Sequence, residues 1–292
     1  MEHGALRPPA RPFAATHAAR RGIAGALLVL AVCACGCAAL DTPAAGAPPV
    51  RAPAWENVAF PADGADFVGA IDLAGLRADP LFGPVLTQLA RKEHLGLLTR
   101  ASQIDAVASI DGGKATGWLV VVHGVHGPPG EGDVGSNPGE VVTAPGAWVF
   151  GEGPAFERVR AAPGLAGARV VLPDRALVAS TAQGRAFPHL RHAELGDLTD
   201  GLGEATAVLL GGAHLEVILR CRYVDATAAR RAATAARVAL VAAAARTDAV
   251  AALARELVQL DFDATGDTVS VRLTLSDDLR DLLVRYVERA TR

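Results

Sequence analysis

Strict alternation of apolar and polar residues in the last third of the chain constrains its fold more than any other feature. In residues 215–223 the odd positions are apolar and the even positions are mostly polar, and residues 268–275 repeat this pattern. A period of two places alternate side chains on opposite faces of a β-strand. Each strand is therefore expected to bury one face and expose the other, which is typical of antiparallel sheets.

Further strands and several helices are predicted from residue 59 onward. Strands are expected over residues 67–73, 104–110, 115–122, 147–150, 169–172, 176–180, 207–210 and 260–264. Helices are expected over residues 80–92, 154–161, 181–195, 226–245 and 248–258, and after Ser276. Asp79 and Asp225 stand where their carboxyl groups can cap the helices that follow them.

The order of these elements occurs twice along the chain. Strand, helix, strand, glycine turn and strand follow one another in residues 67–122, and again in residues 215–275. The sequence therefore predicts an α+β fold of mainly antiparallel sheets with helices on one face. It also suggests two related halves, residues 59–203 and residues 204–292.

Composition excludes several classes of protein. Of the 292 residues, 51% are hydrophobic, which is ample for a folded core and excludes a disordered chain. The 28 basic residues are outnumbered by 31 acidic ones, giving a formal net charge of −3, so a strongly basic nucleic-acid-binding protein is excluded. Four cysteines are too few for a disulfide-dense scaffold.

The N-terminal residues indicate where the protein acts. Arginines at positions 7, 11, 20 and 21 precede an uncharged apolar run over residues 23–32, which is typical of an export signal. The following residues resemble a bacterial lipoprotein signal, in which a lipobox ends at the cysteine that becomes acylated. We favour Cys37, which follows Gly36, and Cys35 is the alternative. Both depart from the usual lipobox in having a cysteine at its second position.

A membrane anchor that is not cleaved is a further alternative. Residues 23–40 carry no charge over 18 positions, which is near the lower limit for a transmembrane helix. The small side chains near the end of this run favour cleavage.

The lipoprotein resemblance implies a division of the N-terminal region. Residues 1–36 would be the signal peptide, and residues 37–58, rich in alanine and proline, an extended tether. Removing residues 1–36 leaves 24 basic and 30 acidic residues, a net charge of −6. The expected partner is then the membrane, reached through the acylated cysteine. Ala38 after the cysteine implies, in a bacterium with two membranes, the outer membrane facing the periplasm.

The fourth cysteine, Cys221, lies in the alternating segment 215–223. Its odd position predicts that it points into the core with Leu219 and Tyr223. A cysteine in such a place is usually an inert small apolar side chain, and we do not expect it to act as a nucleophile.

The first candidate metal ligands are His123 and His126, which precede Glu131 and Asp133. Two imidazoles and a carboxylate can bind zinc. However, residues 127–139 are rich in glycine and proline, and a metal site needs ligands that are held rigidly. We therefore expect both histidines to be solvated in a flexible loop.

The second candidate pair is His189 and His192, which would share one face of a helix at this spacing. Pro188 indicates that a helix begins here, and a solvated helix surface is the expected environment. We predict no metal site and no cofactor.

No sequence motif of a nucleophile elbow, a phosphate-binding loop or a kinase is present. The predicted function is therefore that of a lipid-anchored cell-envelope protein that is not an enzyme and acts as a binding or structural component. One alternative is an envelope metal-dependent hydrolase that uses either histidine pair. Another is a lipoprotein that carries a lipid between its sheet and helices. Besides the membrane, an envelope protein or a lipid is the expected partner, and nucleic acid is not.

Overall fold

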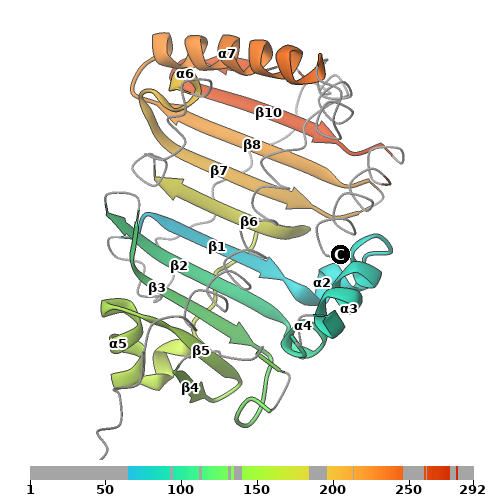
Figure 1. Cartoon of the computed structure of the whole chain (residues 1–292), viewed down its shortest axis with the longest axis vertical. Helices are drawn as coiled ribbons and strands as arrows, with labels where there is room; N and C mark the ends of the chain where they lie inside the picture. Colours follow the sequence, from blue (N-terminus) through green and yellow to red (C-terminus); the bar gives the residue numbers. More distant parts are fainter. Residues whose placement is uncertain are drawn as a thin grey trace, which may run out of the picture.

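A computed structural model describes residues 65–92, 95–111, 114–130, 133–134, 140–183, 196–212, 214–245, 260, 262–276 and 281. Within these residues, ten strands form one sheet in the order β4-β5-β3-β2-β1-β6-β7-β8-β10-β9 (Figure 1). Every pair of neighbours is antiparallel, as the alternation predicts. The strands are β1 (Phe67–Asp72), β2 (Gln103–Asp111), β3 (Lys114–His123), β4 (Val141–Ala144), β5 (Ala147–Glu152), β6 (Ala176–Gln183), β7 (Leu202–Leu210), β8 (Glu216–Tyr223), β9 (Asp263–Thr265) and β10 (Thr268–Thr274).

Aspartates begin the helices that follow β1. Asp72 accepts a hydrogen bond from the Gly75 N–H at 2.9 Å and caps α2 (Leu73–Ala78), a helix that the sequence did not predict. Asp79 accepts from the Leu81 N–H at 2.8 Å, just before α3 (Phe82–Lys92), in the capping role predicted for it. The short helix α4 (Leu97–Arg100) then leads into β2.

Helices cover both faces of the first part of the sheet, so the prediction that they lie on one face is wrong. We call the face with Ile104 and Val120 face A, and the face with Val107 and Val121 face B. Leucines of α2, α3 and α4 pack on face A. Helix α5 (Pro154–Ala161) and the 3-10 helix η2 (Pro163–Gly167) pack on face B, where α5 buries Phe156 and Val159. The physical reason is that β1, β3 and β5 are apolar on both faces and need cover on both.

The last part of the sheet is covered differently. Asp225 accepts from the N–H groups of Thr227 and Ala228, both at 2.8 Å, and caps α7 (Ala226–Ala244). Alanines of α7 pack against Tyr223 and Val269 on face A. The alternation predicted for β8 and β10 is confirmed, since Val217, Val269, Val271 and Leu273 are buried.

The two repeated segments arrange their strands differently in the sheet. In the first, the strands lie side by side as β1-β2-β3, whereas the second gives β8-β10-β9, so that the later hairpin strand pairs with β8. The predicted boundary between residues 203 and 204 falls within β7, and one apolar cluster on face A contains residues from both predicted halves.

Several predictions lie outside the described residues. These are the signal over residues 1–36, the tether over residues 37–58, residues 184–195 with His189 and His192, the helix over residues 248–258, and most of the helix after Ser276. The helix predicted over residues 181–195 is wrong at its start, because residues 181–183 belong to β6. Among the described residues, no helix is both long and apolar enough to cross a bilayer.

Candidate functional site

His123 is not in a solvated loop, and that prediction is wrong. It is the last residue of β3 and pairs with Gln103 at the start of β2. Its side chain is 2% exposed, because the apolar pattern of β3 continues to the end of the strand on face B. His126 is exposed, as predicted. The two imidazoles therefore lie in different environments and do not form a joint site.

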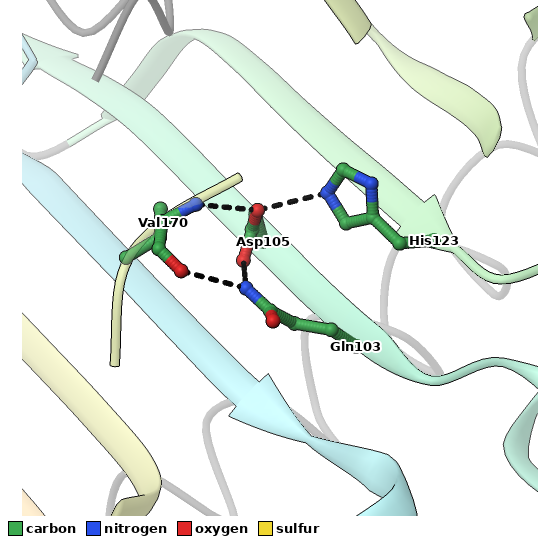
Figure 2. Close-up of polar contacts among 4 residues, drawn as sticks. All are labelled: Gln103, Asp105, His123 and Val170. Carbon is green, nitrogen blue, oxygen red and sulfur yellow. Dashed lines mark hydrogen bonds and ion pairs between the residues drawn. The ribbon is translucent and has the colours of Figure 1, made fainter. Parts of the chain in front are cut away.

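His123 belongs to a buried polar network on face B (Figure 2). Its Nε2 lies 2.8 Å from Oδ2 of Asp105, whose side chain is fully buried. Gln103 donates from Nε2 to Oδ1 of Asp105 at 2.7 Å. The backbone N–H of Val170 donates to Oδ2 of Asp105 at 2.9 Å. Three groups thus meet one carboxyl, which is how a polar side chain is tolerated inside an apolar cluster.

The antiparallel register brings these side chains together. Gln103 and Asp105 are two residues apart on β2 and so point to the same face. Gln103 is directly opposite His123 on β3, while Asp105 is opposite Val121. A diagonal cross-strand contact therefore joins Asp105 to His123.

The network holds a segment that crosses face B. Gln103 donates a second hydrogen bond, to the backbone oxygen of Val170, at 2.9 Å. Both peptide groups around Val170 are thus bound by side chains of β2. We call residues 168–172 the strap. A strand was predicted over residues 169–172, but the strap belongs to no ladder of the sheet. Side chains supply the partners that a neighbouring strand would have supplied.

This arrangement favours positioning over chemistry. A general base must reach the proton that it removes from a substrate. Asp105 and His123 are 0% and 2% exposed, and the Asp105 carboxyl already has three hydrogen-bond partners. The network can therefore fix the strap and the ends of β2 and β3, while in this conformation its carboxyl and imidazole groups are shielded from solvent.

The described part of the segment after His126, residues 127–130 and 133–134, is held more firmly than the sequence suggested. Asp133 forms an ion pair with Arg100 and accepts from the Gly130 N–H at 2.6 Å. Trp148, which is buried, donates to the Gly127 oxygen at 2.6 Å and lies beneath the Arg100 guanidinium. Asp133 is thus a structural partner of Arg100. Over the described residues, no group of three metal-ligating side chains occurs.

Cys221 lies on face A beside Val269 and is half-buried, so its predicted inward direction is confirmed but its burial is incomplete. Sequence reasoning missed Gln103, Asp105 and Val170. The available signal was an aspartate inside the apolar run over residues 104–110, because a carboxyl at such a position needs buried partners.

Comparison with known proteins gives no family. No protein-family model matches the chain, and no curated protein matches it. Three crystal forms of the protein TP0453 resemble the structure at low similarity. Form I has a TM-score of 0.40 and 11% identity, and covers 78% of this chain and 94% of TP0453. Form III has a TM-score of 0.42 and 13% identity, and covers 76% of this chain and 94% of TP0453. Form IV has a TM-score of 0.42 and 11% identity, and covers 78% of this chain and 94% of TP0453.

Proposed function

We propose that this chain is a lipid-anchored cell-envelope protein whose folded part acts as a binding or structural component. The observation that carries the second half of this proposal is the closed state of the Asp105–His123 network. Its two titratable side chains are 0% and 2% exposed and are held by a segment of the chain itself. Such a network supports a fixed surface better than it supports turnover of a substrate.

The anchor rests on the N-terminal sequence. The arginines before the apolar run at residues 23–32, and Gly36 before Cys37, are the features that support it. Acyl chains on Cys37 contribute about 0.8 kcal/mol per buried methylene, so more than one chain gives firm attachment. Residues 38–55 would then hold the folded part up to about 50 Å from the bilayer. Ala38 favours the outer membrane in a host with two membranes.

Metabolic labelling with palmitate tests the anchor. We expect label in the wild type and in Cys35→Ala, and no label in Cys37→Ala. Cys35→Ala is the matched control, since it removes a neighbouring thiol from the same apolar region. Label retained in Cys37→Ala and lost in Cys35→Ala would move the site to Cys35. Label in neither wild type nor variants, in a host that acylates a known lipoprotein, would refute the anchor.

A further inference from the structure

The strap lies on face B in the manner of a bound extended peptide. Its side chains alternate between solvent and the sheet: Arg169 is exposed, Val170 is 2% exposed, Val171 is 65% exposed and Leu172 is half-buried. This is the period-two pattern of an extended segment with one face on a surface. The strap nevertheless pairs with no strand.

The contacts to the strap backbone are of a kind that any peptide can make. Asp105 accepts from the Val170 N–H at 2.9 Å, and Gln103 donates to the Val170 oxygen at 2.9 Å. His123, at 2.8 Å from Asp105, fixes the carboxyl in position (Figure 2). The site thus binds the main chain through a donor and an acceptor, as a neighbouring strand does.

The side-chain contacts supply a preference for apolar residues at alternate positions. Val170 packs in a cluster with Val68 and Ala70 of β1 and Val107 of β2, and Leu172 packs against the same cluster. Main-chain hydrogen bonds with pockets for alternate side chains are the general way in which proteins bind extended peptides.

The two ends of the strap are held in different ways. Gly164 and Gly167, before it, have open space where a Cβ would stand. After it, the Ala176 N–H donates to the Pro173 oxygen at 2.9 Å, and Arg175 donates from Nε to the Gly211 oxygen at 2.8 Å. The turn at residues 173–176 is thereby fixed. On the other side Ala166 of η2 is buried in the face B cluster, so a lifted strap stays attached at both ends.

We propose that the surface formed by Gln103, Asp105 and the apolar side chains of β1 and β2 is a binding site for an extended peptide, which the strap fills in the free protein. The partner is an extended segment of another polypeptide with apolar residues at alternate positions, and it binds when the strap lifts. This inference rests on the proposed function as a binding component and names the class of its partner.

Competition by the strap sets the expected affinity. When a site is open in only a fraction of molecules, the apparent Kd rises by the inverse of that fraction. A strap closed in about 99% of molecules would therefore weaken peptide binding by about 100-fold. Releasing the strap should restore that affinity.

Peptide titration of the full-length protein tests the proposal. The probe is a fluorescent, N-acetylated peptide with the sequence of residues 167–174, followed by fluorescence anisotropy. Val170→Asp places a second carboxyl beside Asp105 and should release the strap. We expect this variant to bind the peptide at least tenfold more tightly than the wild type. Val171→Asp is the matched control, because it adds the same charge at the neighbouring exposed position and should behave as the wild type.

Two further measurements make the result decisive. A peptide with proline at the position of Val170 lacks the N–H that Asp105 accepts from, and should bind Val170→Asp at least tenfold more weakly. Adding Gln103→Ala to Val170→Asp should weaken binding of the original peptide by at least fivefold. If Val170→Asp does not fold, Val170→Pro removes the donor without adding charge, and the same tenfold gain is required of it.

The proposal is overturned if a folded, strap-released variant does not bind the peptide, or binds it no better than Val171→Asp does. Neither result affects the outcome of the palmitate labelling, so failure of the peptide site is distinguishable from failure of the anchor.

Discussion

Asp105 and Arg272 lie in one register row on the same face of the sheet but in opposite environments. Paired residues run across face B in the order Val121, Asp105, Ala70, Ala179, Val208, Ile218 and Arg272. Asp105 is fully buried beneath the strap, whereas the Arg272 side chain is 37% exposed. The pleat gives both positions the same direction, so burial is decided by what the chain lays over the sheet. A polar side chain is thus part of the core at one side of the sheet and part of the surface at the other.

We expect the largest loss of stability from a substitution at the buried end of this row. Asp105→Ala would leave Gln103, His123 and the Val170 N–H without their acceptor in an apolar cluster. Loss of one partner from such a network costs about 3 kcal/mol or more of the free energy of unfolding. Urea denaturation followed by circular dichroism measures this. A loss below about 1 kcal/mol would show that the network does not stabilise the fold.

A single, partly buried hydrogen bond in the last part of the sheet should contribute less to stability. The Tyr223 hydroxyl donates to the backbone oxygen of Leu198 at 2.9 Å, which ties helix α6 (Gly196–Thr199) to β8. Tyr223→Phe removes this bond and keeps the ring, so the free energy of unfolding should fall by about 1 kcal/mol. Equal stability of the two proteins at neutral pH would mean that water replaces the hydroxyl at Leu198.

The same tyrosine should make stability depend on alkaline pH. Burial, and next the neighbouring Cys221, raise the pKa of Tyr223 above its ordinary value of 10.0. Below about pH 10 the phenol is protonated in both states, and above it the unfolded chain ionises first. Stability therefore falls as pH rises above 10, and this fall should be weaker in Tyr223→Phe. Denaturation midpoints at neutral pH and above pH 10 give the comparison, and parallel losses would contradict it.

The exposed end of the row should contribute little. Arg272 bonds through Nε to Glu216 at 2.9 Å and through NH2 at 2.7 Å, and the two side chains are 37% and 18% exposed. Solvent screens such a pair, so Arg272→Ala should lower the free energy of unfolding by about 0.5 kcal/mol. The loss should shrink in high salt. A loss as large as that of Asp105→Ala would remove the contrast between the two ends.

Local signals in the sequence predicted the elements well. The glycine turn between the strands predicted over residues 104–110 and 115–122 agrees with the β2–β3 hairpin. Helix α5 begins and ends where expected, and Asp225 caps α7. These features depend on neighbours within a few residues. The position of His123 depends on where β3 ends, and a difference of one residue moved it from loop to core.

Long-range features could not be predicted from the sequence. Val170 and Asp105 are 65 residues apart, and nothing in residues 168–172 distinguishes a strap held by side chains from a strand in the sheet. The order β8-β10-β9 likewise depends on which hairpin strand docks on β8, and alternation is the same for both choices. Whether helices cover one face or two depends on packing across the whole sheet.

We expect the smallest change in stability from a substitution at the start of α7, and only at acidic pH. Hydrogen bonds from the Ala228 and Thr227 N–H groups, together with Arg231 and Arg230, lower the pKa of Asp225 below its ordinary value of 3.8. A lowered pKa means that the charged cap stabilises the folded state above pH 3.8, and that this contribution disappears as pH falls through the folded-state value. Asp225→Asn keeps a capping oxygen but does not titrate. Far-ultraviolet circular dichroism during acid titration should therefore show a smaller loss of helix in Asp225→Asn than in the wild type below pH 3.8. Because Asp225 is exposed and the asparagine keeps the capping oxygen, an equal loss of helix in the two proteins would mean that protonation of this cap does not limit the stability of α7 in acid.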